Sequence, residues 1–408
     1  MNCRFCGLEL SNIFVSLGVS PLSNAYLKKE QLGIKEPLYP LEVYVCEGCF
    51  LVQLPEFESP ENIFGGDYAY FSSYSDTWLK HTKEYADEMS KRFCLNESSF
   101  VVEVASNDGC LLKNFVKKNI PVLGIEPAQN VAEIARKNGV PTETTFFGSA
   151  TAKRLALTGK KADLLLGNNV LAHVPDINDF VEGLKILLKP AGVITMEFPH
   201  LMKLMDGNQF DTIYHEHFSY FSFITAEKIF NKHGLELFDV QELPTHGGSL
   251  RIYAKNKEDS SKTVSAGIAS LKQKELKAGF ADIAAYCGFK NKVSALKEDI
   301  RRFLDVVKKE GKALVGYGAP AKGNTLLNYC GIGTEHIAYT VDKNPYKQSR
   351  YLPGSHIPIA PPEKIKETKP DYVLILPWNI KDEIMGQMSF IKSWGGKFVT
   401  FVPKIDIN

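Results

Sequence analysis

Short apolar runs and longer amphipathic segments alternate along the middle of the chain, from residue 76 to about 255. Runs such as FVVEVAS, PVLGIEP and ADLLLGNN carry consecutive apolar positions, as buried strands do. The segments between them, such as DTWLKHTKEYADEMSKRF and QNVAEIARKNG, have the apolar spacing of helices packed on a sheet. This alternation predicts an α/β fold with a doubly wound, parallel sheet over residues 76–255.

The pattern differs in the other three regions of the chain. Residues 1–75 are loop-rich, and residues 256–308 are rich in Lys, Ala and Glu at helical spacing. Strand–helix alternation resumes over residues 309–408, where KALVGYG, HIAYTVD, DYVLILPW and KFVTFVP predict strands. We therefore expect an N-terminal lobe (1–75), a central α/β domain (76–255), a helical connector (256–308) and a smaller, Rossmann-like α/β domain (309–408).

Composition and charge narrow the function classes. The 408 residues are enough for two to three domains, and 44% of them are apolar, as in a globular protein with real cores. The formal net charge of +1 gives no electrostatic footprint for nucleic acid or an anionic membrane. No apolar stretch approaches a membrane-spanning length, and the start, MNCRFCGLEL, lacks a secretory signal. We expect a cytoplasmic protein, a monomer or small homo-oligomer, that binds neither nucleic acid nor membrane.

Two C-x-x-C pairs stand in the first fifty residues, Cys3 with Cys6 and Cys46 with Cys49. Each pair can bind one ion from a single turn, and two pairs complete a closed tetrahedral Cys₄ site for Zn²⁺. A closed site leaves no position for water, so the role of the zinc is predicted to be structural. A redox pair or a coincidence of spacing are the alternatives. The acidic sequence around the second pair argues against a zinc ribbon that binds nucleic acid.

A candidate cofactor loop follows the first strand of the central domain. The strand ends near Glu103 and runs into the turn 106–109, and the next strand ends at Glu126, a position suited to ribose hydroxyls. The carboxylates and the single glycine do not suit a dinucleotide pyrophosphate, whereas S-adenosylmethionine carries no phosphate and is cationic. Ordinary turn chemistry remains an alternative. The predicted cofactor residues, which include two at the end of a later strand, are Glu103, Ser106, Asn107, Asp108, Gly109, Glu126, Asn168 and Asn169.

Tyr214, His215, Glu216 and His217 are four consecutive groups that can move protons or donate hydrogen bonds. Aromatic residues surround them, so the pKa values of the cluster can be tuned by burial. Methyl transfer to carbon needs a base for the carbon-bound proton and stabilisation of the resulting enolate, and His and Tyr suit both tasks. A polar loop with stacked aromatics is an equally open alternative.

Two glycine-containing segments follow this cluster. PTHGGSLRIYA indicates either a close backbone approach to a ligand or a plain hairpin. ALVGYGAPAKGNTLL resembles a phosphate-binding strand–loop–helix, in which Gly318 frees the turn and Lys322 opens the helix. Asp342 then occupies the ribose position of a nucleotide fold, and with Lys347 it suggests a site for a nucleotide diphosphate group.

The chain carries a set of motifs in a fixed order: the C-x-x-C pairs, EVASNDG, GNNVLAHVPD, YHEHFSYFS, THGGSLR and GYGAPAKGN. In this set of motifs, the chain resembles the sugar C-methyltransferases that act on nucleotide-linked 4-keto deoxysugars, such as the 3-C-methyltransferases. The resemblance implies a zinc domain, a central S-adenosylmethionine fold and a C-terminal fold that holds the substrate nucleotide, of dTDP or GDP type. It implies that His217 is the base, assisted by Tyr214 and Glu216, with His173 and Tyr68 or Tyr70 in the same site. The residues expected to contact substrate are Tyr70, His215, His246, Arg251, Gly318, Lys322, Asn324, Asp342 and Lys347.

The implied reaction is deprotonation next to the ketone, at C3, followed by attack of the enolate carbon on the methyl group of S-adenosylmethionine. Two other functions remain open at this point. An NAD(P)-dependent oxidoreductase of nucleotide sugars would use GYGAPAKG as its fingerprint, although a strict G-x-G-x-x-G is missing. A non-catalytic zinc scaffold would need none of the chemistry of the Tyr-His-Glu-His cluster.

Overall fold

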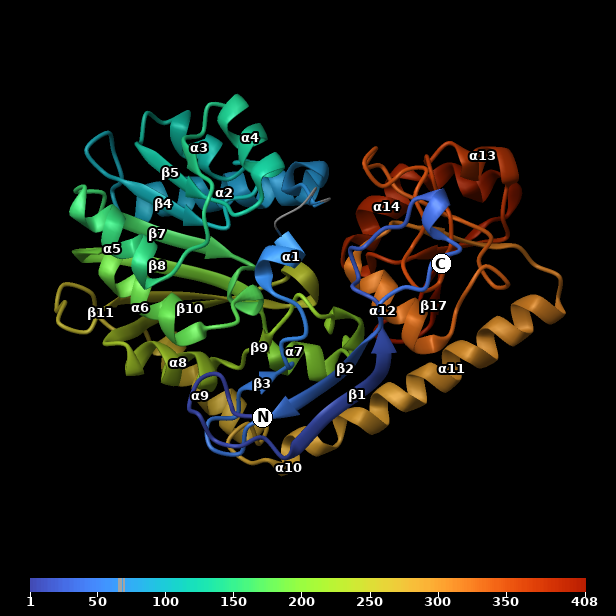
Figure 1. Ribbon diagram of the computed structural model, residues 1–408, viewed down its shortest axis with the longest axis horizontal. Helices are drawn as coiled ribbons and strands as arrows, with labels where there is room; N and C mark the ends of the chain where they lie inside the picture. Colours follow the sequence, from blue (N-terminus) through green and yellow to red (C-terminus); the bar gives the residue numbers. More distant parts are fainter. Residues whose placement is uncertain (65–67, 69) are drawn as a thin grey trace. The chain divides into compact units, whose positions relative to one another are not determined.

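The computed structural model describes residues 1–64, 68 and 70–408, and its chain is divided into two compact units (Figure 1). The first unit is built from Met1–Asn12, Val45–Met202 and Phe218–Ala285. The second unit is built from Ile13–Tyr44, Lys203–His217 and Tyr286–Asn408. Each unit thus collects segments that are far apart in the sequence, and the division into four consecutive parts stays a prediction.

The first unit is centred on a seven-stranded sheet with the order β10-β11-β8-β7-β4-β5-β6. The neighbouring strands from β6 to β8 are parallel, which confirms the doubly wound α/β prediction, whereas β11 is antiparallel to both of its neighbours. The strands are β4 (Val101–Val104), β5 (Val122–Ile125), β6 (Thr142–Glu143), β7 (Ala162–Asn168), β8 (Leu188–Pro199), β10 (Leu235–Leu243) and β11 (Ser249–Asn256).

The helices of the first unit follow the apolar spacing of the sequence. In α2 the buried residues Thr82, Tyr85, Ala86 and Met89 recur three or four positions apart and form one face. Tyr85 and Met89 share a core cluster with α3 and with β4 and β7. The helices are α1 (Pro60–Phe64), α2 (Asp76–Arg92), α3 (Leu112–Val116), α4 (Gln129–Lys137), α5 (Ser149–Leu157), α6 (Ile177–Leu187), α8 (Phe223–Lys232) and α9 (Ala266–Lys277). Two more, α7 (Leu201–Asp206) and α10 (Ala284–Cys287), contain the boundaries at which the chain leaves this unit.

Short elements complete the first unit around these helices. The strands β3 (Val52–Gln53) and β9 (Ser219–Tyr220) pair antiparallel. The 3₁₀ turns are η2 (Ser72–Tyr74), η3 (Leu171–His173) and η5 (Thr245–Gly247). The last of these joins β10 to β11, so the hairpin interpretation of the THGGSLR segment is confirmed.

The second unit contains a six-stranded sheet with the order β14-β13-β12-β15-β16-β17. All neighbours are parallel except β17, which is antiparallel to β16. The predicted Rossmann-like α/β fold is therefore confirmed. The strands are β12 (Leu314–Tyr317), β13 (Thr340–Val341), β14 (Ile359–Ala360), β15 (Tyr372–Ile375), β16 (Lys397–Thr400) and β17 (Asp406–Ile407).

The junction of β12 with the following loop requires glycine at two positions. A Cβ atom on Gly316 would lie 2.6 Å from Oγ1 of Thr340, which no real contact permits. Gly318 has φ of +88° and a Cβ there would lie 2.6 Å from the ring of Pro377. The loop therefore passes close to the neighbouring strands before α12 begins at Ala321.

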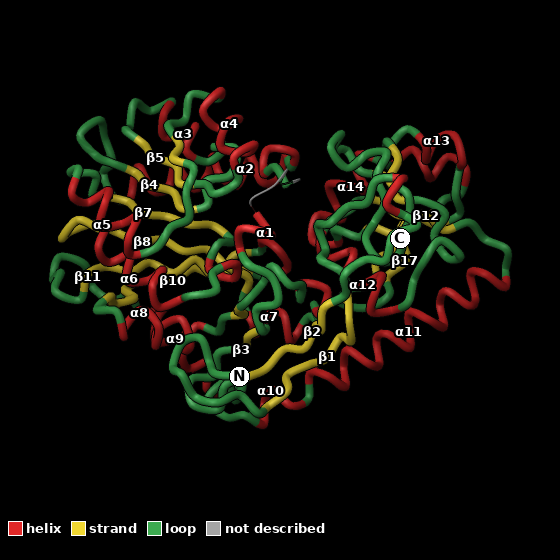
Figure 2. The backbone as a smooth tube through the Cα atoms, viewed as in Figure 1, coloured by secondary structure: helices red, strands yellow, loops and turns green. Residues whose placement is uncertain are grey.

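The long helix α11 (Phe289–Lys309) lies alongside the N-terminal strand β1 (Asn12–Ser20), as Figure 2 shows. The ring of Phe14 stacks on that of Phe289, with ring centroids 4.7 Å apart. β1 neighbours β2 (Tyr39–Val45), so residues far apart in the sequence share one core. The other helices and turns of this unit are α12 (Ala321–Cys330), α13 (Lys364–Thr368), α14 (Lys381–Gln387), η1 (Lys29–Gln31), η4 (Phe210–Thr212), η6 (Trp378–Ile380) and η7 (Ser389–Trp394).

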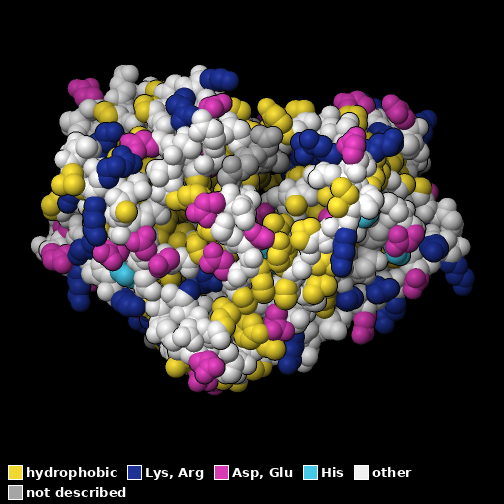
Figure 3. All heavy atoms as spheres, viewed as in Figure 1, with side chains coloured by type: hydrophobic (Ala, Val, Ile, Leu, Met, Phe, Trp, Pro, Cys, Tyr) yellow, Lys and Arg dark blue, Asp and Glu magenta, His cyan; other side chains and the backbone are white. Residues whose placement is uncertain are grey.

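Acidic and basic side chains are interspersed over the face of the molecule drawn in Figure 3, in keeping with the net charge of +1. Among the described residues, no helix is both long enough and apolar enough to span a membrane.

Candidate functional site

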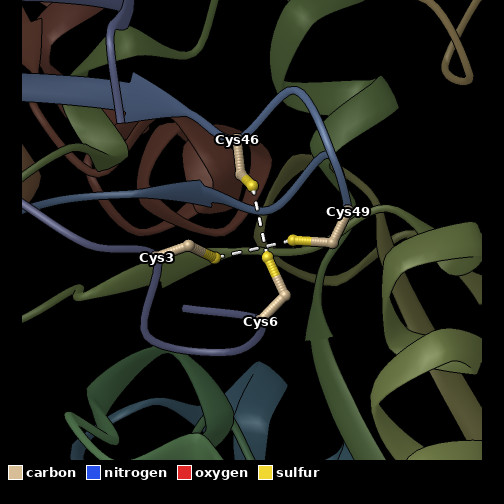
Figure 4. Close-up of side chains that lie close together, drawn as sticks. All are labelled: Cys3, Cys6, Cys46 and Cys49. Carbon is tan, nitrogen blue, oxygen red and sulfur yellow. Dashed lines mark hydrogen bonds between the residues drawn. The ribbon is translucent and has the colours of Figure 1, made fainter. Parts of the chain in front are cut away.

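The four N-terminal cysteines converge on one point within the first unit (Figure 4). Their sulfur atoms all lie within 4.8 Å of one another, with Sγ–Sγ distances of 3.5 Å from Cys3 to Cys49 and from Cys6 to Cys46. The hydrogen bond from Cys49, together with those from backbone N–H groups and from Gln53, lowers the pKa of Cys3. Four convergent sulfurs fit a tetrahedral zinc ion.

The predicted cofactor loop lies at the carboxyl ends of β4 and β5, where ligands of such sheets bind. Glu103 is buried at the end of β4, and burial, with the charges of Asp108 and Glu126, raises its pKa well above the ordinary value. Burial also raises the pKa of Glu126 to about 7, although its two oxygens accept N–H groups from Asn107 and Ala128, each at 2.9 Å. Two buried carboxyl groups with raised pKa values thus lie at the ends of adjacent strands.

Asp108 has a different role in the same loop. It is buried, and its oxygens accept the N–H groups of Ser73 at 3.0 Å and of Cys110 at 3.3 Å. These bonds fix the turn, which Gly109 then leaves with φ of +76°. A Cβ atom on Gly109 would lie 3.0 Å from the side chain of Val140, so the glycine is required here.

Several buried polar atoms at this edge of the sheet have no hydrogen-bond partner among the described residues. They are Oε2 of Glu103, Oγ of Ser106, both side-chain polar atoms of Asn168 and Oδ1 of Asn169. β5, β4 and β7 are neighbours in the sheet, so these atoms belong to adjacent strand ends. Buried polar atoms normally find a partner. This set therefore fits a polar, cationic ligand with hydroxyl groups, as S-adenosylmethionine is.

The backbone carbonyls of the two predicted tyrosines accept hydrogen bonds from asparagine side chains in and near the cofactor loop. The carbonyl of Tyr70 accepts a hydrogen bond from the side chain of Asn107 at 3.2 Å, and the carbonyl of Tyr68 accepts one from Asn130 at 3.0 Å. His173, in η3 of the same unit, has its ring 5.7 Å from that of Phe64. Phe64 also contacts the ring of Tyr68 at 5.5 Å, so one aromatic side chain joins the two predicted residues.

The first unit contains a buried network of charged side chains centred on Glu197, whose backbone carbonyl accepts the N–H group of Asn169. Glu197 is fully buried and contacts Arg251 at 3.0 Å, His81 at 2.9 Å and the Thr245 hydroxyl at 2.9 Å. Burial alone would raise the pKa of Glu197, but the contacts with His81 and Arg251 outweigh burial, so the pKa is lowered. Arg251 is 3% exposed and forms ion pairs with two carboxylates, which supports a structural role for this predicted substrate residue.

His246 links this network to the cofactor asparagines. Its Nε2 lies 3.1 Å from Nδ2 of Asn169, so Nε2 accepts that hydrogen bond. Both residues have left-handed backbones, with φ of +54° for His246 and +56° for Asn169, and the ring of Trp78 lies 5.7 Å from that of His246. Trp78 and Glu197 were not predicted from the sequence, because their partners are distant along the chain.

The Tyr-His-Glu-His cluster belongs to the second unit. Nδ1 of His217 lies 2.8 Å from the carbonyl oxygen of Thr212, and Nε2 of His217 lies 2.8 Å from the Tyr214 hydroxyl. Because a carbonyl oxygen can only accept a hydrogen bond, Nδ1 of His217 carries the proton. Nε2 then has the lone pair and accepts a hydrogen bond from the Tyr214 hydroxyl. Tyr214 and His217 are half-buried, whereas His215 and Glu216 are buried.

The two buried members of the cluster have other partners. Nε2 of His215 lies 3.2 Å from the carbonyl oxygen of Pro40, and burial lowers the pKa of this histidine. Glu216 accepts a hydrogen bond from Asn24 at 2.7 Å, and burial raises its pKa to about 7. Of the two histidines, His217 is thus the one with an acceptor nitrogen directed at a half-buried hydroxyl.

The predicted nucleotide residues of the second unit surround the loop between β12 and α12. Asp342 accepts the N–H group of Ala319 at 2.7 Å, and Lys347 donates to the carbonyl of Ala319 at 2.8 Å. Asn324 donates to the carbonyl of Ser23 at 2.6 Å. Nζ of Lys322 donates to Oδ1 of Asn379 at 2.8 Å. The structure therefore brings these side chains to one loop, each with a partner inside the unit.

Comparisons with known proteins cover nearly the whole chain. A family model described as "C-methyltransferase C-terminal domain" matches residues 244–403, one described as "Putative zinc binding domain" matches residues 3–64, and one described as "Methyltransferase domain" matches residues 78–240. The C-methyltransferase NovU of Streptomyces niveus is 36% identical over 402 residues, which are 98% of this chain and 95% of the relative. The chain belongs to the C-methyltransferase family. This C-methyltransferase is an enzyme that uses S-adenosylmethionine and has a zinc-binding domain at its N-terminus.

More distant likenesses are confined to part of the C-methyltransferase. A ubiquinone biosynthesis O-methyltransferase of Bartonella bacilliformis is 27% identical over 95 residues, 23% of this chain and 38% of the relative. A solved S-adenosylmethionine-dependent methyltransferase of Thermotoga maritima has a TM-score of 0.35 and 22% identity, and covers 45% of this chain and 95% of its own. The family favours the methyltransferase prediction over both the NAD(P)-dependent oxidoreductase and the non-catalytic scaffold.

We expect the zinc site to contribute to the stability of the first unit. Cys46→Ser removes one thiolate, so bound zinc should fall well below one per chain and the melting temperature should drop, because structural zinc binding is coupled to folding. Elemental analysis and thermal denaturation measure the two effects. The matched control is Cys94→Ser, which alters an exposed cysteine outside the cluster. Full zinc content in the Cys46→Ser protein would contradict the assignment.

We also expect the affinity for S-adenosylmethionine to increase with pH. Ribose hydroxyls donate more strongly to a carboxylate than to a neutral acid, and Glu126 with its pKa near 7 is half protonated in the free enzyme at that pH. Affinity should therefore rise between about pH 6 and pH 8, with proton release that calorimetry in two buffers detects. Glu126→Gln should weaken binding about tenfold to a hundredfold, the loss of one charge-assisted hydrogen bond.

The control for this prediction is Glu133→Gln on α4, which removes an exposed carboxylate outside the loop. It should bind the cofactor as the wild type does, with the same proton release. Equal affinity and equal proton release in the Glu126→Gln enzyme would show that Glu126 does not contact the ribose.

Proposed function

We propose that the enzyme methylates a nucleotide-linked 4-keto deoxysugar at the carbon next to the ketone, C3, and that His217 is the general base. The observation that carries the proposal is the hydrogen bond from Nδ1 of His217 to the Thr212 carbonyl, which leaves Nε2 as the acceptor. A histidine nitrogen that accepts hydrogen bonds is suited to proton abstraction near neutral pH.

The partners of His217 suit both stages of proton abstraction. When Nε2 takes the proton from the carbon, Nδ1–H continues to donate to the Thr212 carbonyl and so stabilises the imidazolium. Nε2 can then no longer accept from the Tyr214 hydroxyl, 2.8 Å away. This hydroxyl becomes available to donate to the enolate oxygen, where negative charge develops.

The first unit supplies the residues for the methyl donor. S-adenosylmethionine provides an electrophilic methyl group on a sulfonium, which a carbon nucleophile can attack in line. Glu103, Asn168 and Asn169 have unpartnered polar atoms for its polar groups, and Glu126 stands at the strand end suited to its ribose. The backbone of Tyr70 is joined to this loop by the hydrogen bond from Asn107, and that of Tyr68 is joined to α4 by the hydrogen bond from Asn130.

The second unit supplies the site for the substrate nucleotide in this proposal. Its parallel sheet places the loop of Gly318 and the N-terminus of α12 at the carboxyl end of β12, the usual position of a nucleotide in such folds. Asp342 and Lys347 hold this loop at Ala319, and Asn324 has an unpartnered Oδ1. Glu216 accepts a hydrogen bond from Asn24 and is adjacent to His217 in the sequence, and the charge of Lys347 partly opposes the rise that burial causes in its pKa.

His217→Ala should abolish methylation of a dTDP- or GDP-linked 4-keto deoxysugar and leave S-adenosylmethionine binding intact. Loss of a general base typically lowers the rate by about 10²- to 10⁴-fold. The same variant should lose exchange of the substrate's α-hydrogen with deuterated water in the presence of S-adenosylhomocysteine. Mass spectrometry of product and of recovered substrate measures both.

His215→Ala is the matched control because His215 is adjacent and makes its hydrogen bond to a backbone carbonyl away from Tyr214. It should retain part of both activities. A His217→Ala enzyme that exchanges and methylates at the wild-type rate would place the base elsewhere.

A panel of nucleotide sugars tests the substrate class separately. We expect turnover with 4-keto deoxysugars and none with the corresponding 4-hydroxy sugars, because without the ketone the carbanion has no enolate form. Methylation of a 4-hydroxy sugar at carbon, detected by NMR of the product, would contradict the enolate mechanism.

A further inference from the structure

The base depends on a backbone carbonyl, and this carbonyl is part of the single turn η4 (Phe210–Thr212). A side-chain carboxylate can rotate about its own bonds to meet a partner. The direction of a backbone carbonyl is instead set by the orientation of its peptide plane. The Thr212 carbonyl therefore supports His217 only if the whole turn is held in place. This raises the question of which residue holds η4.

Asp211, in the middle of η4, is fully buried and reaches outside the turn. Its Oδ2 accepts a hydrogen bond from Nε1 of Trp378 at 2.7 Å, although the two residues are 167 positions apart in the sequence. Trp378 begins η6, directly after β15 and the adjoining Pro377 of the Rossmann-like sheet. A carboxyl group buried this deeply is costly unless it is bonded, and burial raises the pKa of Asp211 to about 6.

The residues on either side of Asp211 are fastened to α12. The ring of Phe210 lies 5.2 Å from that of Tyr329 in an edge contact, and the Thr325 hydroxyl donates to the carbonyl of Ile213 at 2.9 Å. Positions 210, 211 and 213 are thus tied to α12 and η6. The carbonyl of Thr212, between them, is the one that serves His217.

Lys322 belongs to the same cluster. Its Nζ lies 4.8 Å from the centre of the Trp378 ring and donates to Asn379, and its charge favours the ionised form of Asp211. Burial lowers the pKa of Lys322, which the charge of Asp211 opposes. The lysine that the sequence predicted as a phosphate contact therefore also supports the anchor of η4.

We propose that Asp211 is a positioning residue for the reaction, which acts through the Thr212 carbonyl by binding η4 to Trp378. The proposal rests on the proposed role of His217 as the base. Without the Asp211–Trp378 bond, η4 keeps its contacts at Phe210 and Ile213 but loses the one in its middle. The Thr212 carbonyl is then held less firmly as the acceptor for Nδ1 of His217. The ring then also populates the tautomer with the proton on Nε2, which cannot accept a proton from substrate.

Trp378→Phe is the sharpest variant, because it removes the N–H donor and keeps an aromatic ring over Lys322. We expect kcat and the rate of α-hydrogen exchange to fall together by about tenfold or more, within the range for impaired general-base catalysis, with the affinity for S-adenosylmethionine unchanged. Asp211→Asn retains an oxygen that accepts from Trp378 and should keep most of the exchange rate, whereas Asp211→Ala should lose it.

The matched control is Trp394→Phe. Trp394 is in the same unit and also donates its Nε1 in a single hydrogen bond, to the carbonyl of Pro370 at 3.0 Å, but it has no contact with η4. Its substitution should leave the exchange rate as in the wild type. Melting temperatures of both tryptophan variants separate a local effect from unfolding of the unit.

The tautomer of His217 is read directly from the ¹⁵N chemical shifts of labelled histidines, assigned with the His217→Ala enzyme. We expect the Nδ1–H form in the wild type and in Trp394→Phe, and a mixture of both tautomers in Trp378→Phe. A pure Nδ1–H form with wild-type exchange in Trp378→Phe would overturn the positioning role. If instead His217→Ala itself exchanges normally, the base assignment fails, while the tautomer measurement still decides whether Asp211 orients the ring.

Discussion

The mechanism that we propose depends on one hydrogen bond, from an imidazole to a backbone carbonyl. The bond from Nδ1 of His217 to Thr212 fixes the tautomer without adding a charge to the site. A carboxylate in the same place would hold the ring as firmly, but it would also add a negative charge that favours the imidazolium. The carbonyl adds no such charge, but its direction depends on the surrounding backbone.

The cofactor side of the enzyme uses the opposite arrangement. Glu103 and Glu126 are buried acids in the same loop, and burial holds both pKa values above their ordinary range. If S-adenosylmethionine binds here as we propose, its positive charge and hydroxyl groups favour the ionised form of the acids, so ligand binding and deprotonation stabilise each other.

Much of this organisation follows from local sequence pattern. The parallel strands and the zinc cysteines were predictable, because apolar runs and C-x-x-C spacing are local signals. The antiparallel β11 was not, since a strand's direction depends on its neighbours and not on its own residues. The ion pairs of Arg251 with Glu197 and Glu88 were not predictable either, because these partners are distant along the chain, and its assignment to the substrate site stays a prediction. The bond between Asp211 and Trp378 carries no local signal at all, as 167 residues separate its partners.

The discontinuity of the two units also has a consequence for how the protein is made. The strands β1 and β2 leave the ribosome early, but α11 and the sheet that completes their unit are synthesised only after residue 286. At ordinary rates of translation this interval is on the order of tens of seconds. During it, Phe14 has no Phe289 to stack on, and an apolar strand stays without its core. Completion of the second unit therefore has to wait until the segment Tyr286–Asn408 has been synthesised.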